Sequence, residues 1–80
     1  MNAKELIELY KAGERDFSGV DLSYKNLMSE NLSHLNLSNV DLNNAHLAHA
    51  DLTGTNLTGA NLRHANLYAA QLCNTNFTNA

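Results

Sequence analysis

The chain has 80 residues, 44% of them hydrophobic, and carries a formal net charge of −3 at pH 7. This length allows one small domain, near the size at which a single core only just offsets the chain entropy lost on folding. The negative charge and the lack of clustered Lys or Arg argue against a protein that binds nucleic-acid phosphates.

Residues 3–12 are predicted to form a short helix, the first element of the chain. Asn2 and Glu5 have the spacing of a capping box, and Gly13 suits the position just after a helix ends. The helix is predicted to have one broad apolar face, made by Leu6, Ile7, Leu9 and Tyr10.

We expect residues 1–14 to cover the N-terminal end of the segment that follows, with the apolar face of the helix turned inward. The alternative is an amphipathic helix that anchors the chain to a membrane surface. Glu5 and Glu8, together with the lack of a basic face, argue against a membrane anchor.

Residues 15–80 repeat with a period of five. Each of thirteen successive units has Leu or Phe at its third position, called the centre below. The centres are Phe17, Leu22, Leu27, Leu32, Leu37, Leu42, Leu47, Leu52, Leu57, Leu62, Leu67, Leu72 and Phe77. Because eleven of the fourteen leucines fall on this one phase, chance does not explain the pattern.

Two other positions of the unit are also patterned. The residue before the centre is Asp or Asn in eleven of thirteen units, with His46 and Gln71 as the exceptions. The residue two before the centre is small from Ala45 onward. A period of five matches neither a helix nor a regular strand. We therefore predict one turn per unit, with Asn and Asp side chains bonded to the turn backbone.

The pattern A-(D/N)-L-x-x, as in Ala50–Gly54 and Ala60–His64, resembles the pentapeptide-repeat family over residues 15–80. The stretch 13–19, which follows a short helix, is similar to the same region of many bacterial and especially cyanobacterial members. The resemblance implies an all-β fold, a right-handed quadrilateral β-helix with four repeats, or twenty residues, per coil. A short N-terminal capping α-helix precedes it.

Three early units depart from the pattern. They carry a charged residue where later units have Ala, namely Arg15, Lys25 and Glu30. We expect these side chains to leave the first coil past its rim or to pair with one another.

The C-terminal end of the solenoid is predicted to expose apolar centres, because no helix or polar cap follows the last unit. The centres concerned are Leu67, Leu72 and Phe77. Solenoid ends need a cover. Either two copies meet end to end as a homodimer, or the 80 residues belong to a longer protein.

With twenty residues per coil, residues twenty apart are expected to lie above one another on the surface. Met28, Ala48 and Tyr68 then form the only apolar and aromatic column, which we predict to be the centre of a partner-binding strip. Tyr24 and His64 are predicted to extend this contact surface. The alternative is that these are scattered exposed apolar residues without a role.

No catalytic, cofactor or metal site is predicted. His46 and His49 lie in one unit and could share an ion, but no third ligand is evident. Cys73 has no His in register and is expected to be an inert thiol. One cysteine, and no segment resembling a signal peptide or membrane span, favour a cytoplasmic protein.

The favoured function is a non-enzymatic scaffold or regulator that binds a protein partner, whose identity the sequence does not give. The alternative, implied by the resemblance, is an acidic rod that imitates DNA and modulates a type II topoisomerase. Direct nucleic-acid binding is not expected. A ligand inside the solenoid is excluded because the Leu-filled core leaves no cavity.

Overall fold

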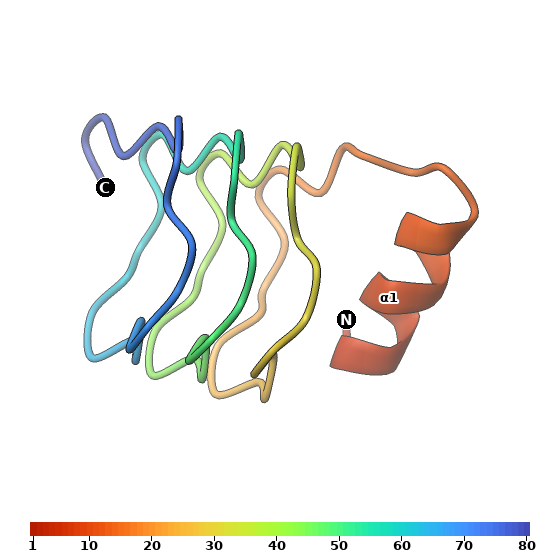
Figure 1. Cartoon of the computed structure of the whole chain (residues 1–80), viewed down its shortest axis with the longest axis horizontal. Helices are drawn as coiled ribbons and strands as arrows, with labels where there is room; N and C mark the ends of the chain where they lie inside the picture. The colour runs from red at the N-terminus through yellow and green to blue at the C-terminus, as the bar shows by residue number, and fades with distance from the viewer.

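The computed structural model describes residues 1–80 as one helix followed by a continuous coil. The helix α1 (Ala3–Lys11) lies across the end of the rod where the first coil begins, and the C-terminus lies at the opposite end (Figure 1). The molecule measures 28 × 21 × 20 Å along its principal axes. It contains no helix with the length and apolar character needed to cross a membrane.

Both ends of α1 are capped as the sequence predicts. The Asn2 side chain accepts a hydrogen bond from the Glu5 amide at 2.8 Å. At the other end, the Gly13 amide donates to the Tyr10 carbonyl and the Glu14 amide to the Leu9 carbonyl, the two bonds of a Schellman motif. Gly13 has a φ of 101°, which explains why the helix ends before a glycine.

The apolar face of α1 is narrower than predicted. Leu6 is fully buried in the main core, and Ala3, Ile7 and Tyr10 pack against it with partial burial. Leu9, in contrast, is 40% exposed. A helix turns by about 100° per residue, so Leu9 falls at the margin of the stripe centred on Leu6 and Tyr10. The prediction that Leu9 belongs to the packed face was wrong.

After α1 the chain winds into a right-handed coil of twenty residues per turn. In Figure 1 the chain descends at the back and rises at the front as it moves away from α1. Nine parallel β-bridges each join residues twenty apart, from Asp16 with Asn36 to Asn56 with Asn76. Four repeats therefore make one coil, and each coil has four sides.

The β-structure consists of isolated bridges, and no side forms a continuous strand. Each unit forms a β-bridge only at the residue before its centre and turns at the two residues after it. The coils are held together by regular amide bonds, such as Leu42 to the Asn61 carbonyl at 2.8 Å and Asn44 to the Arg63 carbonyl at 2.9 Å. The predicted strand-like stacking is present, but a five-residue unit leaves no room for longer strands.

The Asp and Asn residues before the centres bond to the turns, as predicted. In all eleven units that have one, its side-chain oxygen accepts a hydrogen bond from the amide two residues later. The last residue of each unit takes a positive φ, from 56° at Asn79 to 72° at Gly19. Asn and Gly tolerate this conformation well.

The inside of the coil is one hydrophobic core, filled by stacked columns of apolar side chains. The centres from Phe17 to Leu57 are at most 3% exposed, and the small residues Ala45, Ala50, Thr55 and Ala60 are buried beside them. In the first coil, Arg15 turns out past the rim, as predicted for a charged residue there. Its guanidinium lies 3.9 Å from the centroid of the Tyr10 ring and donates to the Tyr10 carbonyl.

Thr55 is the only buried polar residue, and its hydroxyl has a structural role. It donates at 2.6 Å to the Leu32 carbonyl, which accepts no other hydrogen bond. Thr75 makes the same bond one coil later, but its acceptor, the Leu52 carbonyl, also accepts from the Thr55 amide.

We expect Thr55→Val to lower the free energy of unfolding by about 1–3 kcal/mol, because it leaves a buried carbonyl without a donor. Thr75→Val should cost clearly less, since the Leu52 carbonyl keeps its amide partner. Thr55→Ser retains the hydroxyl and is the second control. Urea denaturation of the three variants measures the difference, and equal losses for Thr55→Val and Thr75→Val would contradict this role.

Candidate protein-interaction surfaces

One of the four sides carries most of the exposed large apolar residues of the coil. This side comprises residues 24–29, 44–49 and 64–69, stacked in register by the bridges of His46 with Asn26 and Asn66. We call it the Tyr–His side. Tyr24 and Tyr68 are each 72% exposed and Met28 is 42% exposed. These are three of the four large hydrophobic residues that the solenoid exposes.

The predicted column of Met28, Ala48 and Tyr68 runs along one corner of this side, but its middle residue offers almost no surface. Ala48 is only 6% exposed. A short side chain between two longer ones in the same column is covered from both directions. Any contact made by this column would therefore come from Met28 and Tyr68, about 10 Å apart at the usual strand spacing.

Three histidines also belong to the Tyr–His side. His46 lies at the middle of the side, while His49 and His64 occupy its two corners. The His49 ring meets the Tyr68 ring edge to face, with centroids 5.6 Å apart. Such a contact restrains the exposed Tyr68 ring.

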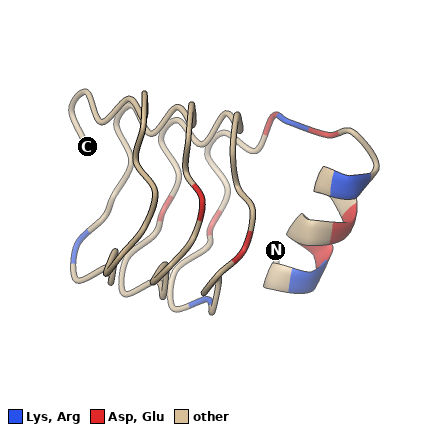
Figure 2. Cartoon of the chain, in the orientation of Figure 1, with Lys and Arg blue, Asp and Glu red and all other residues tan.

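The Tyr–His side contains no Asp or Glu, and Lys25 is the only charged residue in its three segments. The acidic residues lie elsewhere, mostly around α1 and the earlier coils (Figure 2). The Tyr–His side is therefore aromatic and polar but carries no acidic residue, although the whole chain has a net negative charge.

The four aspartates of the coil accept hydrogen bonds from the turns. The pKa of Asp21 lies below its usual value, chiefly because the Ser23 hydroxyl and amide donate to its carboxylate, with Lys25 adding a smaller effect. Hydrogen bonds from Ser18 lower the pKa of Asp16. Those from Thr53, with a contribution from His34, lower the pKa of Asp51. These carboxylates stabilise the turns next to them.

No group of three His, Cys, Asp or Glu side chains is close enough to hold a metal ion. His46 and His49 point to different parts of one side, and His34 lies in another column, over Gly54. Cys73 is an exposed free thiol.

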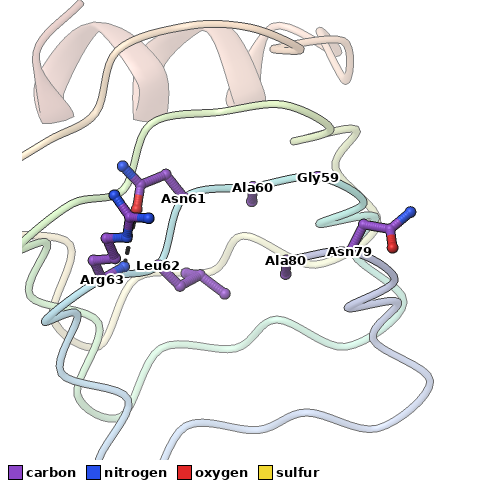
Figure 3. A pocket seen from close by; sticks show the side chains of 7 residues that line it. All are labelled: Gly59, Ala60, Asn61, Leu62, Arg63, Asn79 and Ala80. Atoms are coloured by element: carbon purple, nitrogen blue, oxygen red, sulfur yellow. Dashed lines mark hydrogen bonds between the residues drawn. The ribbon is translucent and has the colours of Figure 1, made fainter.

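The C-terminal end is the second candidate surface. Leu72 is 40% exposed, whereas Leu67 and Phe77 are partly buried and pack against the core. An open hollow of about 620 Å³ adjoins this end (Figure 3). It is lined by Gly59, Ala60, Asn61, Leu62, Arg63, Asn79 and Ala80. Arg63 is its only ionisable side chain, so the hollow has no acid, base or nucleophile for catalysis.

The sequence indicated Tyr24, Met28, Tyr68 and His64 as exposed surface residues, and the structure brings them to one side. The sequence alone did not place His46 on this contact surface. His46 replaces the usual Asp or Asn before a centre. That departure from the repeat was the available signal, because a residue at this position points outward at the middle of a side.

Comparison with known proteins identifies the repeat. The family model for pentapeptide repeats matches residues 16–47 and 41–79, with eight copies. No curated protein shows significant similarity to the chain.

Two solved structures are similar. One is a pentapeptide repeat protein, Rfr23, from the cyanobacterium Cyanothece 51142, with 28% identity and a TM-score of 0.60 over 80% of this chain. The chain spans 57% of the length of that protein. The other is alr5209, a pentapeptide repeat protein from Nostoc PCC 7120, with 37% identity and a TM-score of 0.42. That match covers 86% of this chain and 74% of alr5209.

Proposed function

Because the chain belongs to the pentapeptide-repeat family, we propose that it acts as a non-enzymatic scaffold or regulator that binds a protein partner through its Tyr–His side. The observation that carries this proposal is the exposure of Tyr24, Met28 and Tyr68 on one side of a rigid rod. Tyr and Met are enriched in protein–protein contacts, whereas Asp, Glu and Lys are depleted at the centre of such contacts.

The rod suits a scaffold because its backbone is restrained on every side. Amides of each coil donate to carbonyls of the neighbouring coils at 2.8–3.0 Å, and the interior is filled by Leu centres. A preorganised surface loses little conformational entropy when a partner binds. The filled interior also offers no enclosed site for a small-molecule ligand.

The charge pattern does not favour the alternative of a DNA-imitating rod. Asp21 stacks on Asp41, but Asn61 follows in the same column. Asp16 is followed by Asn36 and Asn56. A rod that imitates DNA needs regularly spaced negative charge, which these columns lose after one or two coils.

The test compares the wild type with the double variant Met28→Ser, Tyr68→Ser as baits in host lysate. A partner recovered by the wild type is identified, purified and titrated against both proteins. We expect the double variant to bind at least about tenfold more weakly, because buried aromatic contacts dominate interface energies. Its circular dichroism spectrum should be unchanged, since both side chains are exposed.

Leu9→Ser is the matched control, because it removes a similarly exposed apolar residue from α1. It should bind the partner as the wild type does. If the double variant retained every interaction, the Tyr–His side would not be the contact surface. Recovery of topoisomerase subunits through another side would instead support the alternative function.

A further inference from the structure

Three of the four histidines lie exposed on the Tyr–His side, and the fold makes no use of their ring nitrogens. They are His46, His49 and His64. The side-chain hydrogen bonds in the three segments of this side are made by Asn26, Asn44 and Asn66, and none involves a histidine ring. A neutral imidazole offers one donor and one acceptor, and a protonated one offers two donors. These three rings are therefore free to bind another molecule.

His46 gives up a hydrogen bond that the same position makes in the adjacent coils. Asn26 precedes it in the column and Asn66 follows it, and the side-chain oxygen of each accepts from the amide two residues later. The corresponding amide after His46 belongs to Ala48, and it donates no hydrogen bond within the chain. A residue that departs from a local rule of the fold without a structural gain is expected at a functional site. The histidine at the middle of the side therefore favours a role in binding.

The other ionisable groups on this side and at its corner are positive or neutral. Lys25 belongs to the first of the three segments, and Arg63 comes directly before His64. Tyr24 and Tyr68 carry phenols, which are uncharged near neutral pH. The protonated imidazoles therefore meet no carboxylate on their own side.

The nearest acidic residues of the coil belong to the two neighbouring sides. Glu30 and Asp51 lie on the side that follows, and Asp21 and Asp41 lie on the side that precedes. Their negative charge borders the Tyr–His side along both of its corners. A long polyanion such as a nucleic acid would meet this charge, whereas a short acidic segment can stay within the side.

His34, the one histidine outside the Tyr–His side, has an acidic neighbour within the chain. Its ring lies over Gly54. Hydrogen bonds from Thr53 stabilise the Asp51 carboxylate most, and the charge of His34 adds a smaller effect. No carboxylate is stabilised in this way by an imidazole of the Tyr–His side. The fold thus leaves the other three histidines without an internal partner.

Proton uptake turns the Tyr–His side into a positive surface. Histidine is the side chain whose charge changes between pH 5 and 8. Three protonated imidazoles and Lys25 together give four positive charges, with no negative charge in the same segments. Coils lie about 4.8 Å apart, so three of them span about 10 Å, which an extended peptide covers in about three residues. A short run of Asp or Glu therefore matches the side in length and in charge.

We propose that the Tyr–His side binds an acidic segment of its protein partner, and that His46, His49 and His64 supply the positive charge that recognises this segment. The inference rests on the proposed function, because it names the chemistry of the partner at the same side. A carboxylate next to an imidazole favours the protonated ring, so binding takes up protons. Affinity for the acidic segment consequently rises as the pH falls through the range in which histidine gains its charge.

The test is an NMR titration of the full chain, labelled with ¹⁵N, with a peptide of ten aspartates at about pH 7.5 and about pH 5.5. The peptide stays ionised at both pH values, so its own charge does not change. We expect it to bind about tenfold more tightly at the lower pH, since each exposed ion pair contributes modestly. The amides that shift should belong to residues 24–29, 44–49 and 64–69, and the gain should shrink at high salt.

The decisive variant combines His46→Asn, His49→Asn and His64→Asn, and it should bind the peptide with the same weak affinity at both pH values. Asn occupies the same positions of the unit elsewhere in the coil, including those with a positive φ, so the fold should be kept, which circular dichroism checks. His34→Asn is the matched control. His34 is also exposed and also has a positive φ, but it lies on another side, so this variant should keep the gain at low pH.

Equal affinity of the wild type at both pH values would overturn the proposal, as would a pH dependence that survives in the triple variant or is lost with His34→Asn. Tighter binding of a ten-nucleotide thymidine strand than of the peptide at the lower pH would overturn the assignment of a protein segment. Should the triple variant not fold, the pH dependence of the wild type and the residues that shift decide. A partner that needs Met28 and Tyr68 but binds equally well at both pH values would leave the proposed function standing and remove this inference alone.

Discussion

Leu47→Ala is expected to lower the free energy of unfolding by about 2–5 kcal/mol, the usual range for truncating a buried leucine. Leu47 is completely buried in the second coil, between the centres Leu27 and Leu67 of its column. Its truncation leaves a cavity in a tightly packed interior that backbone bonds on all four sides prevent from collapsing. A small domain has a total stability of about 5–15 kcal/mol, so this change removes a large share of it.

Urea denaturation followed by circular dichroism measures the loss, at a fixed protein concentration because dimerisation would add to the apparent stability. Leu47→Met is the control. It nearly conserves the volume and should cost less than about 1.5 kcal/mol. If Leu47→Ala and Leu47→Met had the same midpoint as the wild type, the packing of the centres would not be what holds the coils together.

Leu6→Ala is expected to cost about 2–5 kcal/mol, although Leu6 lies outside the repeats. Its side chain is completely buried in the same cluster as Leu22, Leu27 and Leu32, three of the four centres of the first coil. Truncation weakens the contact through which α1 covers that coil. Partial release of the helix would also break the Tyr10 hydroxyl bond to the Ser33 carbonyl, which measures 3.1 Å.

Leu9→Ala is the control, because it changes the same helix but leaves the packing of Leu6 against the first coil intact. Leu9 is 40% exposed, and Ala is the better helix former, so we expect a loss below about 1 kcal/mol. Thermal denaturation of both variants gives the comparison. Equal losses would mean that α1 does not cover the coil through Leu6. Binding of the wild type to lipid vesicles, abolished by either change, would favour the membrane-anchor alternative.

The repeat itself was predictable because the residues that specify each unit are adjacent in the sequence. Each unit folds by local rules, with a large apolar centre inward, an Asp or Asn bonded to the turn, and a positive φ at the last residue. These rules repeat every five residues and need no knowledge of distant contacts. The register of twenty residues per coil came from the family resemblance, and the bridges between Asp16 and Asn36 and onward confirm it.

The surface was only partly predictable. The stacking rule placed Met28, Ala48 and Tyr68 in one column, but the burial of Ala48 depends on the length of the side chains on either side of it. Likewise, the outward position of Leu9 depends on how α1 is rotated against the first coil. Neither property follows from periodicity, because both are set by neighbours distant in sequence.

The sequence by itself determined the repeat, the inward-facing centres and the turn chemistry, since these arise from interactions within five residues and from a pattern repeated thirteen times. Only the tertiary structure decided which side groups three histidines with two tyrosines. The physical reason is that the sides exist only after the coils stack. His46, His49 and His64 share a side through backbone bonds across twenty residues.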